Sequence, residues 1–318
     1  MAAFRRQPCG VSPGTPVMKL HQLRALAAVS ETGSIQEASR LLYVTQPALS
    51  KAIKELETSV GATLFVRTSK GVQLTPHGQR LVAHARLISE NVRRARQDLE
   101  DMKGTVVSDI VVGVTPVSAL LRSVGACLTA FRADFPHARL RILEMRPAQL
   151  LEQVREGTLD FALTSQSLPV DRALDCTQAC RVPTLIAGRK GHPLRGATSL
   201  AELVQADWMV LDPLSDPHTP LHQLFSANGL DLPARVVECN SMTLALEMSR
   251  LGDVLLLLSE ESRRSRFLVQ TMDFVEIAEP VPERTISLVT RDRHTLTLAA
   301  SRLHDALLAA LREDFPGT

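Results

Sequence analysis

The chain has 318 residues, too many for one ordinary hydrophobic core, so two or three domains are expected. A hydrophobic fraction of 45% and a charged fraction of 22% are those of a globular protein, and no apolar run approaches the roughly 18 residues of a membrane span. Five scattered cysteines argue against a disulfide framework and for a reducing, cytoplasmic compartment. Residues 1–17 lack the apolar stretch of a secretory signal, and their prolines and glycines predict a disordered extension.

Positive charge is concentrated in the front part of the chain. Residues 18–103 contain 13 Lys/Arg and 8 Asp/Glu, whereas residues 104–318 contain 21 Lys/Arg and 26 Asp/Glu. A basic front and an acidic back suggest that only the front part meets a polyanion such as nucleic acid. The alternative is a chance distribution of charges over solvated faces.

The first helices are predicted from apolar spacing and capping signals. Helical spacing begins at Met18 and stops at Gly33, a residue type that commonly ends helices. Ser34 and Glu37 then form the pattern of a capping box, in which the serine hydroxyl and the glutamate carboxylate each satisfy a free amide. A short second helix through Leu42 follows, and residues 43–44 form a turn.

A third helix is predicted from Gln46 to about Ser59, capped by Thr45 and ended by Gly61. One face is apolar and is expected to pack on a core: Leu49, Ala52, Ile53, Leu56 and Val60. The opposite stripe is polar or exposed: Gln46, Pro47, Ser50, Lys51 and Lys54. Short strands at 64–66 and 72–74 around a turn at 68–71 add a hairpin, so residues 18–76 have the pattern of a winged helix-turn-helix.

Such a third helix fits the major groove of double-stranded DNA. Gln46 can pair with adenine or a phosphate, Pro47 can touch a thymine methyl, Lys51 can reach a base or a phosphate, and Lys54 a phosphate. Ser50 lies on the same stripe. Further contacts with the DNA backbone or minor groove are predicted from the cap and the hairpin: Thr45, Arg67, Thr68, Lys70 and Thr75. The alternative is that these polar residues only solvate the domain.

A long linker helix is predicted over residues 77–104, beginning near Pro76. Apolar residues recur along it at alternating intervals of four and three: Leu81, Ala85, Ile88, Val92, Ala95, Leu99 and Met102. This seam over three heptads favours dimerisation through the helix, the alternative being packing on its own domain.

From Gly104 onward, strands alternate with helices, which predicts α/β architecture with parallel sheets. Strands are expected at 109–114, 140–145, 160–164, 235–239, 254–258 and 286–290, and helices at 116–135, 147–156, 242–250 and 297–311. Segments 139–165 and 235–259 form a weak internal repeat, which indicates two similar lobes with a cleft between them. Lobe I is expected to comprise residues 105–181 and 290–318, and lobe II residues 182–289.

An ordered set of residues in the front part resembles the LysR-type transcriptional regulators. It comprises GSIQEASRLL at 33–42, TQPALS at 45–50, and Ile53, Leu56, Glu57, Gly61, Leu64, Phe65, Arg67, Leu74, Thr75 and Gly78. The resemblance covers the chain from Met18 onward. It implies a DNA-binding domain, a dimerising linker helix, a two-lobed effector domain like periplasmic binding proteins, and a homotetramer.

The back part resembles members that sense small aromatic or sugar-acid compounds. In the family the strand corresponding to 254–258 usually ends in proline, whereas here it ends in Ser259, so a different loop is expected there.

The effector site is expected where parallel strands end, in the crevice between the lobes. The end of strand 109–114 opens a helix whose free amides and dipole suit an anion such as a carboxylate or sulfonate. The predicted effector-binding residues are Thr115, Pro116, Ser118, Thr164, Ser165, Asp212 and Ser241. Two questions stay open: Thr115 and Ser118 could only cap their helix, and Asp212 could repel an anion or bind an amine or hydroxyl.

No catalytic constellation, cofactor motif or metal-ligand spacing is visible; His218 and His222 lack a third partner. Cys176 and Cys180 lie near the expected lobe crossing, but nothing in the sequence favours their thiolates. The sequence therefore predicts a regulator that binds double-stranded DNA, a small anionic effector and its own copies, with RNA polymerase as a further partner. A solute-binding protein without a DNA role and an enzyme are the alternatives.

Overall fold

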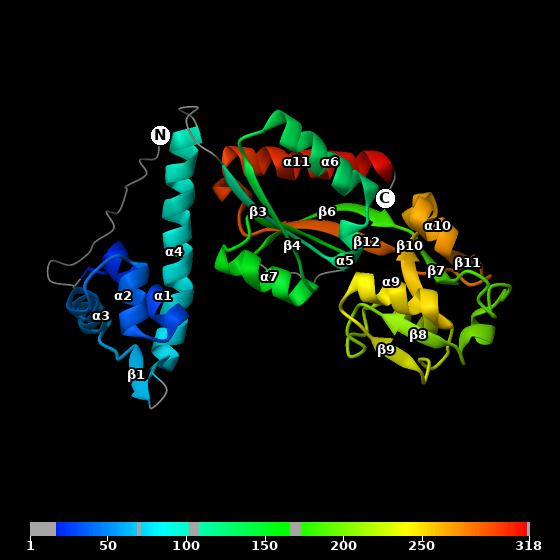
Figure 1. Ribbon diagram of the computed structural model, residues 1–318, viewed down its shortest axis with the longest axis horizontal. Helices are drawn as coiled ribbons and strands as arrows, with labels where there is room; N and C mark the ends of the chain where they lie inside the picture. The colour runs from blue at the N-terminus through cyan, green and yellow to red at the C-terminus, as the bar shows by residue number, and fades with distance from the viewer. Residues whose placement is uncertain (1–16, 69–70, 102–107, 166–172, 317–318) are drawn as a thin grey trace, which may run out of the picture. The chain divides into compact units, whose positions relative to one another are not determined.

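The computed structural model describes residues 17–68, 71–101, 108–165 and 173–316. The chain divides into two units, Met1–Ala95 and Arg96–Thr318, each with its own core (Figure 1). Within the described ranges, no helix combines the length and apolar character needed to cross a membrane. The predicted extension lies outside the described residues except for Val17, as do Met102 of the linker seam and Lys70 of the predicted wing.

Three helices open the first unit: α1 (Leu20–Thr32), α2 (Ile35–Leu41) and α3 (Gln46–Val60). Gly33 and Gly61 end α1 and α3 in the left-handed conformation, as their positions predict. The capping box of α2 forms only by half. Ser34 accepts a bond from the Glu37 amide at 3.4 Å, but the Glu37 carboxylate binds Arg40 at 2.8 Å. The Ser34 amide donates instead to the Thr32 hydroxyl at 3.3 Å, so it does not need Glu37.

Three hydrogen bonds connect the hairpin of β1 (Phe65–Thr68) and β2 (Gly71–Leu74) and the residue before it to the helical part of the unit. Glu57 on α3 accepts from the amides of Leu64 and Phe65 at 2.7 and 3.3 Å. The amide of Val72 donates to the carbonyl of Gly33 at 3.0 Å. These bonds set the position of the hairpin relative to α3.

The linker helix α4 spans Pro76–Asp101. Its predicted seam divides into two parts. Ala85 is buried in the core of the first unit and Leu81 packs against that core, so packing on the own domain explains this end. Farther along, the side chains of Ile88 and Leu99 are 42% and 61% exposed in the single chain. The far part of the seam therefore leaves apolar surface uncovered.

In the described part of the second unit, two five-stranded sheets form the two lobes. The strands of the first sheet are β3 (Asp109–Val114), β4 (Arg139–Glu144), β5 (Phe161–Thr164), β6 (Asp175–Val182) and β12 (Arg284–Thr290). The strands of the second are β7 (Thr184–Arg189), β8 (Asp207–Val210), β9 (Val236–Glu238), β10 (Val254–Ser259) and β11 (Met272–Val275). We call the lobe of the first sheet lobe I and that of the second lobe II.

The two sheets have the same topology. Their orders are β4-β3-β5-β12-β6 and β9-β8-β10-β7-β11. In each, the first three strands are parallel and the last two pairings are antiparallel. The structure thus confirms the internal repeat but corrects the expectation of parallel sheets, because strands β6, β7 and β11 were not predicted and each joins a sheet antiparallel to its neighbours.

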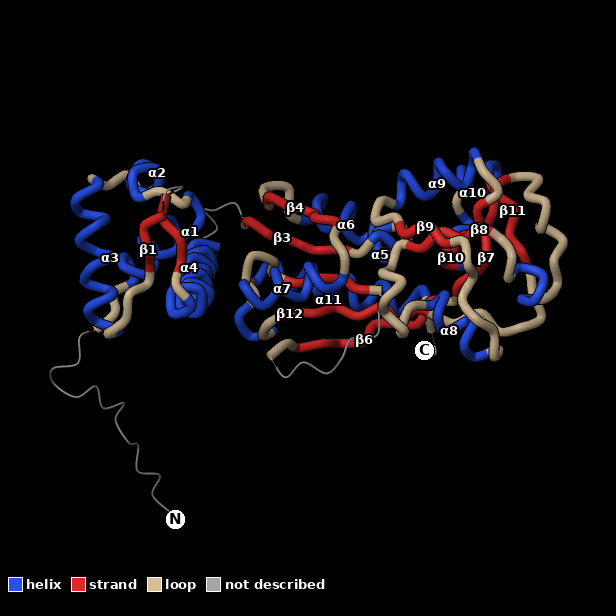
Figure 2. Tube along the Cα trace, turned by 90° about the horizontal axis from the view of Figure 1, so that it is seen from below, coloured by secondary structure: helices blue, strands red, loops and turns tan. Residues whose placement is uncertain are grey.

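Helices cover both faces of each sheet. Lobe I contains α5 (Pro116–Ala119), α6 (Arg122–Asp134), α7 (Pro147–Glu156) and α11 (Leu298–Asp314). Lobe II contains α8 (Pro220–Ala227), α9 (Met242–Leu251) and α10 (Arg266–Thr271). In lobe I, α6 and α11 lie on one face and α7 on the other (Figure 1). In lobe II, α9 and α10 lie on one face and α8 on the other (Figure 2). Short 3-10 turns add η1 (Leu200–Leu203), η2 (Glu260–Arg264) and η3 (Arg293–Thr295).

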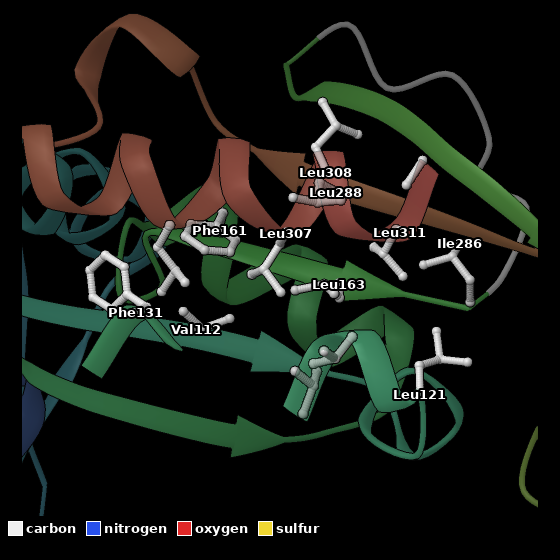
Figure 3. Packing of buried hydrophobic residues seen from close by; sticks show 14 of the residues in the cluster. Val112, Leu121, Phe131, Phe161, Leu163, Ile286, Leu288, Leu307, Leu308 and Leu311 are labelled. Carbon is white, nitrogen blue, oxygen red and sulfur yellow. The ribbon is translucent and has the colours of Figure 1, made fainter. Parts of the chain in front are cut away.

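The core of lobe I shows why one predicted helix is two. Phe131 of α6 and Leu307 and Leu311 of α11 pack on Phe161 and other strand residues (Figure 3). Leu121, between α5 and α6, has extended backbone and is buried in the same core. The helix expected over 116–135 breaks here because burying Leu121 needs this turn of the chain.

The chain crosses between the sheets twice, and the second crossing differs from the expectation. The first lies between β6 and β7, at Val182–Thr184, close to the predicted boundary. The second lies between β11 and β12 and ends at Arg284, not at residue 290. Residues 284–289, which were assigned to lobe II, belong to lobe I because β12 pairs with β6 along its whole length and with β5 from Ser287 to Thr290.

Candidate DNA interface and effector site

The predicted DNA-reading face of α3 is exposed as a continuous stripe. Leu49, Ile53 and Leu56 are buried in the core of the first unit. The stripe on the other side comprises Gln46, Pro47, Ser50, Lys51 and Lys54, all of them exposed. The core thus holds α3 by one face and leaves donors, acceptors and two cations on the other, which is the arrangement that a recognition helix needs.

The two lysines of this stripe differ in their surroundings. Lys51 Nζ lies 4.0 Å from Glu55, whose carboxylate also accepts from Gln22 at 3.1 Å. Lys54 forms no ion pair with any residue that the structure describes. Its charge is therefore free for a phosphate, whereas part of the Lys51 charge is offset by a neighbouring carboxylate.

The predicted contacts around the cap and the hairpin fall into two groups. Arg67 and Thr68 are exposed on β1, and Thr45 is exposed while its hydroxyl accepts from the Ala48 amide at 3.4 Å. The Thr75 hydroxyl is used within the domain, because it donates to Thr63 at 2.7 Å and accepts from the Gly78 amide at 3.0 Å. Thr75 therefore caps α4, a role that the prediction did not include.

Tyr43 is a surface residue that sequence reasoning left out of the candidate interface. It stands in the turn before α3 with φ of 55°, and 96% of its surface is exposed. An exposed tyrosine in a left-handed turn is uncommon, because the turn costs backbone energy and the ring stays in water. The turn position was visible in the sequence, whereas the exposure of the ring was not.

Three effector candidates of lobe I, Thr115, Ser118 and Ser165, form one buried hydroxyl cluster. The Thr115 hydroxyl lies 2.9 Å from that of Ser118 and donates to Ser165 at 3.0 Å. Ser118 also accepts from the Thr115 amide at 2.9 Å, and that amide donates to Leu163 as well. Thr164, next to them, is fully buried and its hydroxyl has no hydrogen-bond partner. Pro116 is half-buried at the start of α5.

This cluster changes the expectation of an anion at a helix start. Helix α5 has only four residues, and the Thr115 amide and the Ser118 hydroxyl bind each other. A single turn has little dipole, because the dipole grows with aligned peptide units. The hydrogen bonds of Thr115 and Ser118 therefore agree with the alternative in which these two residues cap their helix.

Asp212 has an ionic partner that was not predicted. Its carboxylate lies 3.0 Å from the guanidinium of Arg284, and the two side chains are 13% and 4% exposed. Arg284 is the first residue of β12 in lobe I, and Asp212 follows β8 in lobe II. This buried ion pair therefore joins the two lobes. The two residues are separated by 72 positions, so no local motif could have revealed the pair.

Two further polar contacts join the lobes. Arg146, after β4, lies 3.5 Å from Glu238 at the end of β9, and both are about a third exposed. Glu261, after β10, accepts from the Arg122 amide at the start of α6 at 3.0 Å. The carboxyl ends of the parallel strands β4, β8, β9 and β10 thus lie at the boundary of the lobes, which is where ligands bind in α/β folds, while Arg284 and Arg122 contribute from the starts of β12 and α6.

Ser241 of lobe II caps α9, accepting from the Leu244 amide at 3.3 Å. Its neighbours Cys239 and Met242 belong to the same buried cluster as Val117 of α5. The apolar surface of α5 is thus packed into lobe II beside Ser241. The structure places Asp212 in contact with lobe I and Ser241 beside residues that pack on α5, whereas the bonds of the predicted lobe I hydroxyls stay within lobe I.

Comparison with known families matches both parts of the chain. A family described as "Bacterial regulatory helix-turn-helix protein, lysR family" matches residues 20–79, and one described as "LysR substrate binding domain" matches residues 104–312. The chain belongs to the LysR family of transcriptional regulators.

Relatives of the LysR family with curated names extend the match. The HTH-type transcriptional regulator GbpR of Azospirillum brasilense is 30% identical over 237 residues, 73% of this chain and 68% of that protein. The HTH-type transcriptional regulator GalR of Pseudomonas putida is 28% identical over 309 residues, 96% of this chain and 76% of that protein. These names describe transcriptional regulators.

Solved structures share the fold at lower identity. A full-length OxyR variant from Pseudomonas aeruginosa superposes with a TM-score of 0.67 at 20% identity, covering 93% of this chain and 95% of that one. CbnR, described as a LysR family transcriptional regulator, superposes with a TM-score of 0.65 at 21% identity, covering 92% and 99%. This LysR-family chain is a DNA-binding transcriptional regulator with an effector-binding domain, and the comparisons give no support to a solute-binding protein without a DNA role.

The predicted departure of this LysR-family chain from the family pattern lies at Ser259. Ser259, where the family usually has proline, has φ of −67° and ψ of 147°, a conformation that proline also adopts. The serine therefore leaves the backbone unchanged at this residue and adds a buried hydroxyl that has no hydrogen-bond partner.

A redox switch formed by Cys176 and Cys180 has no structural basis. Both lie on β6, four residues apart, so their Cα atoms are separated by about 13 Å, well beyond the roughly 7 Å limit of a disulfide. Burial, with the carboxylates of Glu261 and Asp314, raises the pKa of the Cys180 thiol to about 12. Among the described residues, no group of three or more His, Cys, Asp and Glu could hold a metal ion.

Proposed function

We propose that this regulator binds paired operator half-sites through α3 and the hairpin, under the control of a small-molecule effector bound between the lobes. The observation that carries the DNA part is the exposed stripe of α3, held from behind by Leu49, Ile53 and Leu56. The proposed interface comprises Thr45, Gln46, Pro47, Ser50, Lys51, Lys54, Arg67 and Thr68, together with Lys70, which lies outside the described residues. CbnR, which has this fold, has been solved in complex with its target DNA.

Self-association brings two such units to one operator. The uncovered apolar side chains of Ile88 and Leu99 lie on the far part of α4, at the spacing of a helix-pairing seam. We expect two copies to pair along this part of the helix and two pairs to form a homotetramer. RNA polymerase is the further partner expected of a regulator that acts at promoters.

The effector is expected to be a small anion held at the boundary of the lobes. Its proposed surroundings are Thr115, Pro116, Ser118, Thr164, Ser165, Asp212 and Ser241. The unpartnered, buried hydroxyl of Thr164 supports a ligand, because buried polar groups normally have partners. Regulation by ligand binding requires no catalysis, and we expect none.

The DNA role is tested by a gel shift with the DNA upstream of the protein's own gene, measured over a range of salt concentrations. Lys51→Ala is expected to weaken specific binding by about 1–3 kcal/mol. Lys54→Ala is expected to weaken binding to all sequences alike and to reduce the salt slope by about 0.9. Lys190→Ala, in lobe II, is the control and should change neither quantity. Equal losses on specific and random DNA for both α3 variants would refute the division of roles.

A further inference from the structure

Arg284 is a buried cation with few partners. Its guanidinium is 4% exposed and donates one hydrogen bond, from Nη2 to Asp212 at 3.0 Å. Its Nε atom is buried and has no hydrogen-bond partner. A guanidinium carries five N–H donors, and leaving a buried donor unpaired is costly. Arg284 therefore has unused capacity for an acceptor with two oxygens.

Asp212 is a partner that can be exchanged. It comes from the loop after β8 in lobe II, whereas Arg284 begins β12 in lobe I. Asp212 forms no other hydrogen bond or ion pair with the described residues. The single contact is not the paired, two-bond geometry that an arginine prefers with a carboxylate. A carboxylate with freer placement could use both Nε and Nη2.

The space beside this pair limits how a ligand can enter. A cavity of about 20 Å³ is lined by Arg284, Asp212, Thr219 and Leu211, among others. This volume fits about one water molecule. A ligand carboxylate therefore cannot join the existing pair, and it must take the place of the Asp212 carboxylate.

The other candidate sites for an anion at the boundary of the lobes are less suited to bind one. Arg146 also has a buried Nε atom without a hydrogen-bond partner, but its side chain is about a third exposed and paired with Glu238, so water screens its charge. The start of α5 offers a single helical turn whose serine and threonine hydroxyls already bind each other. Arg284 is thus the buried charge that an anionic ligand would gain most from reaching.

We propose that Arg284 is the receptor for the carboxylate of the effector, and that Asp212 is a built-in competitor which the ligand displaces. This inference rests on the proposed function, since it assigns a residue to the effector site. When the ligand displaces Asp212, the loop after β8 in lobe II is released from β12 in lobe I. Ligand binding would in this way change the bond that joins the lobes.

Asp212→Asn tests the proposal with a probe that does not require the natural effector. The change keeps the shape of the side chain and removes the competing charge. Formate is the probe, exchanged against chloride at constant ionic strength, with neutral formamide as a chemical control. The readout is the thermal unfolding of the full chain, followed by the fluorescence of Trp208, which is buried in lobe II.

Formate should raise the Tm of Asp212→Asn by about 3–5 °C for each tenfold excess over its dissociation constant. Wild type should bind formate roughly 10- to 150-fold more weakly than Asp212→Asn. In wild type, formate must first break the charged hydrogen bond between Arg284 and Asp212, and such a bond contributes about 1.5–3 kcal/mol. The double variant Asp212→Asn with Arg284→Met should not respond. Glu238→Gln, which removes the exposed bridge between the lobes, is the matched control and should behave as wild type.

The proposal is overturned if the single and double variants respond alike, or if neither responds to formate. Should Asp212→Asn not fold, Arg284→Lys is compared with wild type, because lysine keeps the charge but not the two-pronged geometry. An equal response of these two proteins would then overturn it. Gel shifts on the same samples distinguish this proposal from the proposed function. If formate does not bind but DNA does, only the role of Arg284 is refuted. If DNA does not bind, the proposed function is refuted.

Discussion

Gly78, in the first turn of α4, allows the linker helix to approach the DNA-binding unit. A Cβ atom added at this position would lie 2.2 Å from the carbonyl oxygen of Leu64 and 2.9 Å from Cδ2 of Leu74. The Leu64 carbonyl is held in place, because it accepts from the Thr75 amide at 2.9 Å. The backbone would have to move by about 1 Å to restore an ordinary contact. Gly78→Ala therefore forces apart the helix and the base of the hairpin.

The expected magnitude follows from opposing contributions. Alanine in place of glycine stabilises a helix by about 0.5–1 kcal/mol. Overpacking costs about 1–3 kcal/mol or more, and weakening the Thr75–Leu64 bond costs about 1 kcal/mol. Gly78→Ala should thus destabilise the first unit by about 1–3 kcal/mol. Gly125 on α6 is the matched control, because nothing lies within 4 Å of the added Cβ atom. Gly125→Ala should stabilise lobe I by about 0.5–1 kcal/mol.

Native-state hydrogen exchange measures both effects in one protein, since it reports each segment separately. Gly78→Ala should lower the protection of β1, β2 and the start of α4 and should weaken DNA binding. Gly125→Ala should raise the protection of α6 and leave DNA binding unchanged. If Gly78→Ala raises protection in its own helix as Gly125→Ala does, the close approach to Leu64 is not a constraint and the reasoning is wrong.

Other predictions concern α4, α11 and β6. Leu99→Asp should weaken self-association at least about 100-fold in sedimentation velocity, because it removes an apolar contact from both helices, whereas His84→Asp, off the seam, should have no such effect. Burial lowers the pKa of His304 below 6.5, so its contribution to stability is complete above pH 6.5 and is lost as the pH falls, when the unfolded chain takes up the proton first. Denaturation between about pH 7 and pH 5 should therefore show a flatter pH dependence for His304→Gln than for wild type; equal slopes would contradict this. At pH 8 a disulfide reagent should label the exposed Cys176 and leave Cys180 unlabelled until unfolding, since the raised pKa keeps the Cys180 thiol protonated; equally fast labelling of both would contradict it.

The DNA-binding unit was largely predictable because its signals are local. Gly33, Thr45 and Gly61 each act within one turn of chain, and the two faces of α3 follow from a period of 3.6 residues. The half-formed capping box of Ser34 shows the limit of this reasoning. The pattern was present, but the Glu37 carboxylate pairs with Arg40 and the Ser34 amide donates to Thr32, so these two groups do not bind each other.

The second unit was predictable in outline, and less so in its sheets. The helix α7 and strand β3 have the predicted bounds, since each is a continuous periodic segment between clear stops. Strand β8 was not among the predicted strands. In strand β6, buried and exposed residues do not alternate regularly, because a bulge interrupts the pairing of this strand with β12. Such features depend on neighbours that are far away in the sequence.

The effector site is the part that sequence patterns describe least, and the repeat explains why. Each lobe brings the carboxyl ends of its parallel strands to the boundary, so contacts form between equivalent elements, as Arg146 after β4 and Glu238 on β9 show. The second crossing is fastened at its end by the Thr184 hydroxyl, which donates to the carbonyl of Pro282. Arg284 follows two residues later and is held in lobe I because it pairs with Val182 of β6, whereas its partner Asp212 belongs to lobe II. A ligand that replaces Asp212 would thus act on the relation between the lobes without changing either sheet, which is the property that a regulatory site needs.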